Sequence, residues 1–89
     1  MTRERAPRIA DGIIYKKVGE ELVLLDFERG TYFGLDEVGA RIWQLVADGL
    51  TPAAIAERIV AEYDVDIDVA ARDVEALLDQ LAAKQLVID

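Results

Sequence analysis

A short aromatic strand runs directly into a helix, with no linker between them, in residues 30–43 (GTYFGLDEVGARIW). Gly30 offers the positive φ that hairpin loops often need, and residues 31–35 are rich in strand-forming side chains. Asp36 is a good N-cap, and its carboxylate also suits the positive end of a helix dipole. We therefore expect residues 31–35 to be the last strand before a helical remainder, with a free edge at which another chain can pair.

Two more strands are predicted upstream, in residues 13–18 and 21–27, which carry β-branched, aromatic and leucine side chains. The unbroken apolar run of residues 22–25 indicates a strand that is covered on both faces, because a half-exposed strand would alternate. The three strands are short and separated by tight turns. We expect them to form an antiparallel meander.

Three helices are predicted after the strands. The first begins at Asp36 and ends at Gly49, a left-handed C-cap, and Trp43 on its flank is expected to pack in the core. The second helix begins with Thr51 as its N-cap and Pro52 at its first position, which is the usual place for proline in a helix.

The third helix is predicted to begin near Asp66 or Asp68 and to end near Lys84. Its apolar stripe is expected to face the core and consists of Val74, Leu77, Leu78 and Leu81. Residues 85–88 follow as either a short final strand or an extended tail.

The predicted order, β-β-β-α-α-α, is that of an α+β domain. The tight junction at residues 49–52 resembles the turn of a helix-turn-helix, and a small sheet beside it makes a wing. We therefore expect a winged helix-turn-helix, with a three-stranded antiparallel sheet followed by three helices. Residues 1–8 are expected to be a flexible tail and residues 9–89 to form a single domain, because a chain of 89 residues has room for one modest core.

Composition excludes several kinds of chemistry. The chain contains no histidine and no cysteine, which removes disulfides, thiol nucleophiles, imidazole bases and the zinc sites built on these residues. No apolar run approaches the ~20 residues of a membrane helix, and no apolar segment follows the charged N-terminus as it does in a signal peptide. We expect a cytoplasmic protein with no cofactor, no metal, no catalytic residues and no membrane partner.

An acidic cluster, formed by Glu62, Asp64, Asp66 and Asp68, is the first candidate site. Alternating acids on a loop suit a hard cation, but the EF-hand pattern fails because the segment has no central glycine and no glutamate at the twelfth position. A solvated loop that caps the next helix is the favoured interpretation. Paired carboxylates for acid–base catalysis are also disfavoured, since there is no histidine, cysteine or glycine-rich phosphate loop to complete such a site.

Charge argues against a nucleic-acid partner. Residues 1–35 hold six basic and six acidic side chains, whereas residues 36–89 hold four basic and twelve acidic ones. The predicted third helix, residues 66–84, carries two basic and five acidic side chains, although DNA-binding helices use Arg and Lys to contact phosphates and bases. A winged-helix transcription regulator nevertheless stays the alternative from a different functional class.

Two features combine into a candidate binding groove. The strand of residues 31–35 offers a free edge, with Phe33 and Leu35 expected inside and Tyr32 partly exposed. The third helix carries a second stripe of small or mixed side chains, with Arg72 beside it, and this stripe consists of Val69, Asp73, Ala76, Gln80 and Ala83. The simpler interpretation of the stripe is an ordinary solvent boundary. The functional interpretation is the floor of a shallow groove, in which an extended peptide pairs with the strand by β-augmentation.

Residues 25–43 resemble the PqqD-like family, the RiPP recognition elements, and residues 50–52, the second helix and residues 69–86 extend the resemblance to nearly the whole chain. The resemblance implies a winged helix-turn-helix that binds the leader of a ribosomally synthesised precursor peptide. The leader is expected to lie as an added strand on residues 31–35, against the third helix. A protein of this family presents the peptide to modifying enzymes and has no chemistry of its own.

The same resemblance implies a set of leader-binding residues on two elements. They are Thr31, Tyr32, Phe33, Gly34 and Leu35 on the strand, and Val69, Arg72, Asp73, Ala76, Leu77 and Gln80 on the helix. Leu77 and Tyr32 are expected to line apolar pockets. Arg72 is expected to pair with a leader carboxylate, and Asp73 with a leader donor or cation.

A stand-alone chain of this length looks most like the leader-binding proteins of lasso-peptide pathways. Those proteins work with a transglutaminase-like leader peptidase and, later, with a macrolactam-forming cyclase. The other stand-alone setting is pyrroloquinoline quinone biosynthesis, where the partner is a radical SAM enzyme. The sequence leaves open which leader and which enzyme are involved, and whether a second copy of the chain fills the free edge when no peptide is bound.

Overall fold

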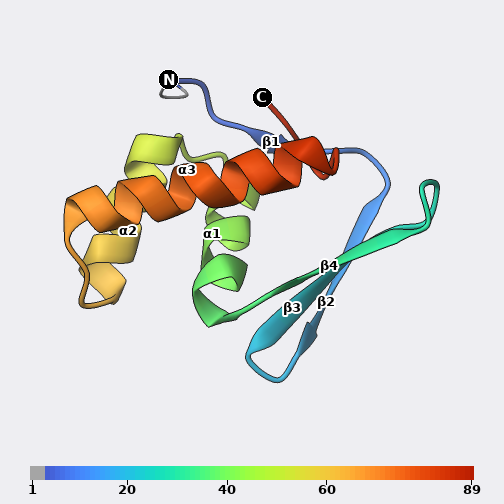
Figure 1. Ribbon diagram of the computed structural model, residues 1–89, viewed down its shortest axis with the longest axis horizontal. Coiled ribbons are helices and arrows are strands. Elements are labelled where there is room, and N and C mark those ends of the chain that lie inside the picture. The colour runs from blue at the N-terminus through green and yellow to red at the C-terminus, as the bar shows by residue number, and fades with distance from the viewer. Residues whose placement is uncertain (1–3) are drawn as a thin grey trace.

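The computed structural model describes residues 4–89, which form three helices and five strands (Figure 1). In chain order the elements are β1 (Arg8–Ile9), β2 (Ile13–Val18), β3 (Glu21–Asp26), β4 (Thr31–Leu35), α1 (Glu37–Ala47), α2 (Pro52–Glu62), α3 (Ile67–Ala83) and β5 (Val87–Ile88). The chain thus has the predicted α+β class, with a three-stranded antiparallel sheet and three helices. Over residues 4–89, none of the helices has the length and apolar character that a membrane crossing requires.

Strands β2, β3 and β4 form the predicted meander, in which β3 lies between the other two. Leu24 of β3 lies opposite Tyr15 of β2 on one side and opposite Phe33 of β4 on the other. Within the described part of the chain β4 is paired only with β3, so its outer edge is free, as the sequence predicts. Its unpaired backbone groups point away from the sheet and are available to another extended chain.

The prediction that β3 is covered on both faces is wrong. Leu22 and Leu24 are buried, whereas Val23 and Leu25, which point to the other face, are only partly buried. All three helices lie on one side of the sheet (Figure 1), so no helix covers its outer face. The outward side chains of β3 are shielded only in part, by their neighbours on β2 and β4.

The helix ends lie where the sequence predicts them. The Asp36 carboxylate accepts a hydrogen bond of 2.8 Å from the Gly39 amide at the start of α1. The Thr51 hydroxyl accepts a backbone amide of α2 at 3.2 Å. Gly49 has a φ of +87° just after α1, which is the left-handed conformation that favours glycine. Asp66 precedes α3 but makes no side-chain capping bond.

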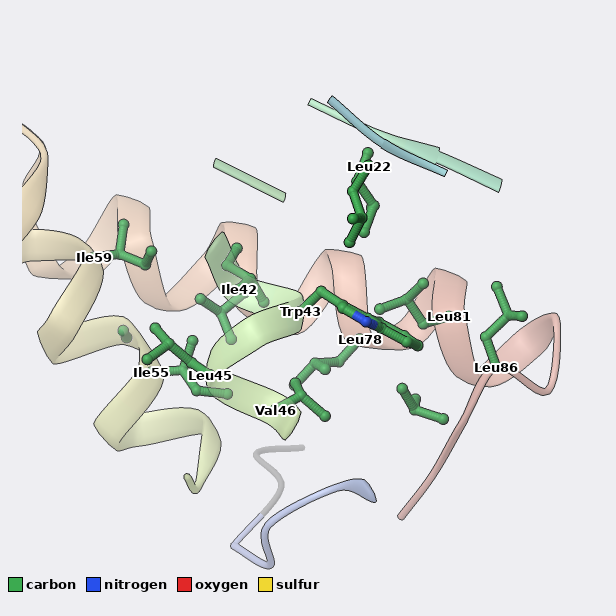
Figure 2. Close-up of a cluster of buried hydrophobic side chains, with 14 of the residues drawn as sticks. Leu22, Ile42, Trp43, Leu45, Val46, Ile55, Ile59, Leu78, Leu81 and Leu86 are labelled. Carbon is green, nitrogen blue, oxygen red and sulfur yellow. The ribbon is translucent and has the colours of Figure 1, made fainter. Parts of the chain in front are cut away.

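The core lies between the sheet and the helices, and Trp43 of α1 is at its centre (Figure 2). Trp43 is fully buried, as predicted, and its ring lies edge-on to the ring of Tyr15, with centroids 5.5 Å apart. Leu24 of β3 and Leu78 and Leu81 of α3 are buried in the same cluster. Helix α1 therefore connects the sheet to α3 and fixes the distance between them.

The N-terminal segment departs from the expected flexible tail. Residues 1–3 of that tail lie outside the described residues, but Pro7 is buried and Arg8 belongs to β1. Strand β1 pairs antiparallel with β5, so the end of the chain is a strand and not an extended tail. The sequence hides this pairing because each of the two strands is two residues long, too short for an alternating pattern to be visible.

Asp26 organises the hairpin between β3 and β4, and it is a buried charged residue. Its Oδ1 atom accepts hydrogen bonds from the amides of Glu28 at 3.1 Å and Arg29 at 3.3 Å. Its Oδ2 atom lies 3.5 Å from Nε of Arg29. The loop then reverses at Gly30, with a φ of +66°. These bonds fix the point at which β4 begins.

We expect Asp26→Ala to lower the free energy of unfolding by about 1–2 kcal/mol, because two loop amides lose their acceptor. Asp26→Asn is the matched control, since its amide oxygen still accepts while the charge facing Arg29 is gone. Its loss of stability should therefore be smaller. Urea denaturation followed by circular dichroism measures both, and equal losses in the two variants would contradict the role given to the backbone hydrogen bonds.

Candidate functional site

An open groove of about 590 Å³ lies between β4 and α3. Its two walls consist of Phe33, Gly34, Leu35, Ala70, Asp73, Val74, Ala76, Leu77 and Gln80. Helices α1 and α2 and the segments next to them complete the lining with Asp36, Val38, Gly39, Ile42, Ile59, Tyr63 and Val65. The groove is thus bounded on one side by the strand whose outer edge is free.

Most of the predicted leader-binding residues meet in this groove. Seven of the eleven line it, namely Phe33, Gly34, Leu35, Asp73, Ala76, Leu77 and Gln80. The other four, Thr31, Tyr32, Val69 and Arg72, do not line it. The strand and the helix named in the prediction thus bound one groove, and the assignment of these residues to leader binding stays a prediction.

Tyr32 does not line the groove because it points to the outer face of the sheet. It lies opposite Leu25 on that face and is 73% exposed, so the predicted partial exposure is confirmed, while the expected apolar pocket is not part of the groove. Phe33 is half-buried and Leu35 is buried, as predicted. Thr31 lies at the hairpin end of β4, opposite Asp26.

The groove face of α3 is rotated from the predicted stripe toward the core. Val69 and Arg72 are exposed and lie outside the groove, whereas Val74, which was expected only in the core stripe, lines it together with the predicted Leu77. Successive residues of an α-helix point about 100° apart around its axis. A small rotation of the helix therefore changes which side chains face the groove. The pairing of Arg72 with a leader carboxylate therefore stays a prediction.

Sequence reasoning missed the residues that α1, α2 and the loop after α2 contribute. Ile42 and Ile59 are buried and form the floor of the groove, but their helical spacing indicates only core packing. Tyr63 and Val65 follow α2 and reach the groove because α2 packs against α3. A contact of this kind depends on how two helices cross, which a single sequence does not reveal.

An ion pair joins the middle of α1 to the C-terminal end of α2 next to the groove. Arg41 donates from Nε and Nη2 to the two carboxylate oxygens of Glu62, at 2.7 and 2.8 Å. These hydrogen bonds lower the pKa of Glu62 and raise the pKa of Arg41. Because both side chains reach solvent, the pair contributes modestly to stability. It also fixes the C-terminal end of α2 and, with it, the position of the next residue, Tyr63.

Tyr63 stands at one end of the groove, with its hydroxyl 3.5 Å from Oε2 of Glu37. Burial of the ring raises the pKa of Tyr63 above its ordinary value, and the negative charges of Glu37 and Glu62 raise it further. The phenol is therefore neutral at physiological pH and presents an apolar ring to the groove.

The groove offers an extended chain an unpaired strand edge and apolar side chains. Its ionisable side chains are Asp36, Tyr63 and Asp73, and an oxygen of Asp36 already caps α1. Across residues 4–89, no group of three or more His, Cys, Asp or Glu side chains is placed to hold a metal ion. Backbone groups of β4 and apolar side chains of α3 are what an extended peptide uses when it adds to a sheet edge.

Residues 21–87 match the family model described as coenzyme PQQ synthesis protein D (PqqD), which covers three quarters of the chain. The chain belongs to the PqqD-like family of RiPP recognition elements. The matched residues run from the first residue of β3 into β5, so both walls of the groove lie within the family domain. None of the curated proteins matches the chain.

Two solved structures share this fold. TbiB1 in complex with the TbiA(beta) leader peptide is 44% identical with a TM-score of 0.85, and the match covers 90% of this chain and 93% of that one. A lasso peptide synthetase B1 complexed with the leader peptide is 31% identical with a TM-score of 0.87, and the match covers 94% of this chain and 99% of that one. Both of these relatives are thus proteins solved together with a leader peptide.

The raised pKa of Tyr63 leads to a titration experiment. When tyrosinate absorbance is followed, we expect a late step from Tyr63, at a pH above the ordinary pKa of tyrosine. The late step should vanish in Tyr63→Phe and move to lower pH in Glu37→Gln, because the nearby negative charge that disfavours tyrosinate is removed. Tyr32→Phe is the control and should leave the late step in place. A late step that survives in Tyr63→Phe would contradict the assignment.

Proposed function

We propose that the chain is a non-catalytic peptide chaperone that binds the leader of a ribosomally synthesised precursor peptide. The leader pairs as an added strand with the free edge of β4 and lies against α3. The observation that carries this proposal is that the unpaired edge of β4 and the exposed face of α3 bound one groove. The two relatives solved with leader peptides, at 44% and 31% identity, support the same ligand class.

The dimensions of the groove agree with a short extended segment. Strand β4 has five residues, which span about 16 Å at ~3.3 Å per residue. About five peptide residues therefore pair with β4, and further residues contact the walls. Such a ligand buries no more than a standard interface, so we expect a dissociation constant of about 0.1–1 µM.

The winged helix-turn-helix assignment belongs to the same proposal. Helices α1, α2 and α3 follow a small meander, in the order that such a domain requires. Helix α3 carries four acidic side chains and one basic side chain, so the transcription-regulator alternative is disfavoured by charge.

The enzymes served by the bound leader are part of the proposal as well. The lasso peptide synthetase named in one match supports a lasso-peptide setting, in which this chain delivers the leader to a transglutaminase-like leader peptidase and then to a macrolactam cyclase. The family name, coenzyme PQQ synthesis protein D, supports the alternative of a radical SAM partner. Both settings are cytoplasmic and require no cofactor on this chain.

A substitution in the groove tests the proposal with a defined probe. The probe is a fluorescein-labelled TbiA(beta) leader peptide, the ligand named for the 44% identical relative. Ala76→Asp places a carboxylate in the groove wall, so we expect binding to weaken about tenfold or more, because the charge loses water without gaining a partner. Fluorescence anisotropy measures the affinity.

The matched control for Ala76→Asp is Ala71→Asp, the same change on the same helix. Ala71 is exposed and does not line the groove, so this variant should bind as the unmodified chain does. Circular dichroism should show native helix content for both variants. Equal affinities for the two variants would place the peptide elsewhere on the molecule, and no binding by the unmodified chain would exclude this leader as a ligand.

A proline scan of the same leader tests strand addition. In an antiparallel pair, only alternate residues of the added strand donate an amide to the neighbouring strand. Because proline has no amide proton, we expect proline to weaken binding strongly at every second position of the paired segment and weakly between them. Anisotropy titrations of the substituted peptides measure this pattern. A uniform effect along the leader would contradict pairing with β4.

A further inference from the structure

Opposite charges lie in the groove and just beyond it, along one helix face. Asp73 lines it on the N-terminal half of α3, and Lys84 immediately follows the last residue of that helix. Residues 73, 77, 80 and 84 recur at intervals of three and four, so they share one helix face. That face thus begins with a carboxylate, continues with an apolar side chain and an amide, and ends with an ammonium group.

Lys84 lies beside the groove, because its ammonium group contacts Phe33 of β4. Its Nζ atom lies 5.8 Å from the centroid of the Phe33 ring, within the range of a cation–π interaction. Phe33 lines the groove. The cation therefore stands next to the Phe33 part of the site, above the strand to which a peptide would pair.

The opposite part of the groove is negatively charged. Asp73 is exposed there, and Asp36 at the start of α1 also lines the groove. Glu37 is held at the same place by its contact with Tyr63. Arg72 precedes Asp73 but does not line the groove, so the carboxylate of Asp73 is the charged group that α3 presents to a ligand.

The two charges are separated by a distance that an extended peptide spans in a few residues. Eleven steps of an α-helix separate positions 73 and 84, which correspond to about 16 Å at ~1.5 Å per residue. An extended chain covers that length in about five residues. A single short segment in the groove therefore reaches both Asp73 and Lys84.

The direction of the segment follows from the direction of the strands. Strand β4 ends at α1, while α3 runs from its loop with α2 toward β5, so the two walls run in opposite directions (Figure 1). All pairs in the meander are antiparallel, and antiparallel pairing is the slightly more stable kind. An added antiparallel strand has its N-terminal part beside Asp36 and Asp73 and its C-terminal part beside Lys84.

We propose that the groove selects extended peptides by the order of their charges, with a basic side chain about four or six residues before an acidic one, because only residues at even separations share one face of a strand. The basic side chain faces Asp73 and the acidic side chain faces Lys84, so the charges also set the direction in which the peptide binds. This inference rests on the proposed function and adds a recognition rule to it. Each exposed pair contributes about twofold to fivefold in affinity, and the preference weakens in high salt.

The experiment is a selection from a library of random 12-residue peptides displayed on phage. The unmodified chain and the charge-exchanged double variant Asp73→Lys, Lys84→Glu serve as separate targets. We expect the unmodified chain to enrich Lys or Arg about four or six residues before Asp or Glu, the even separations that place both side chains on the face toward α3. The double variant should enrich the reverse order, and washing at about 0.5 M salt should reduce the bias in both selections.

A second exchange, Glu57→Lys with Arg58→Glu, is the matched control. Both residues are exposed on α2 and do not line the groove, and the net charge is unchanged, so its selected peptides should keep the order found for the unmodified chain. Enriched peptides should also lose binding to Ala76→Asp, which ties them to the groove.

The outcomes separate this inference from the proposed function. Enrichment of groove-binding peptides without the charge order would overturn the recognition rule while leaving peptide binding intact. The reverse order selected by the unmodified chain would overturn the assigned direction. No enrichment above the bare support would count against peptide binding by the groove, and therefore against the function on which the rule rests.

Discussion

The junction between β4 and α1 is the constraint on which the rest of the structure depends. The Asp36 carboxylate bonds the Gly39 amide at 2.8 Å, one residue after the strand ends. A Cβ atom at Gly39 would lie 3.2 Å from both the Asp36 carboxylate and the Leu35 side chain, so the turn is close-packed. Because no linker separates the two elements, α1 cannot shift without moving the strand edge.

The helix that follows this junction is anchored in the core by Trp43. Trp43 is two turns along α1 and contacts Tyr15 of the sheet, while α3 packs its leucines into the same cluster. The sheet, α1 and α3 are thereby packed around one rigid side chain, and the groove opens beside this core, between β4 and α3. A binding site that is formed before the ligand arrives costs less ordering on association, which suits a protein whose task is to hold a flexible peptide.

The features that could be predicted from the sequence are those that depend on interactions between residues close together in the chain. Asp36, Thr51 and Gly49 are capping residues whose function needs only their nearest neighbours along the chain, and all three lie where expected. The free edge of β4 was also predictable, because a strand that leads directly into a helix completes a meander. The groove residues Asp73, Ala76 and Gln80 followed from helical spacing on α3.

The features of the fold and groove that could not be predicted depend on contacts between residues that are far apart in the sequence. The pairing of β1 with β5 joins the two ends of the chain through strands of two residues, and nothing in either segment indicates the other. Tyr63 and Val65 reach the groove because of the way α2 packs on α3. The outer-face position of Tyr32 follows from strand alternation, but its distance from the groove depends on how the sheet lies relative to α3.

The pairing of β1 with β5 has a consequence for how this domain can be joined to other proteins. The two short strands bring the segments before residue 8 and after residue 88 to one place, at the top of Figure 1, whereas β4 meets α1 at the bottom of that view. Neighbouring chain ends are the arrangement that permits a domain to be inserted in a loop of a larger protein. Joining this domain to another protein at both of these positions is therefore compatible with its fold.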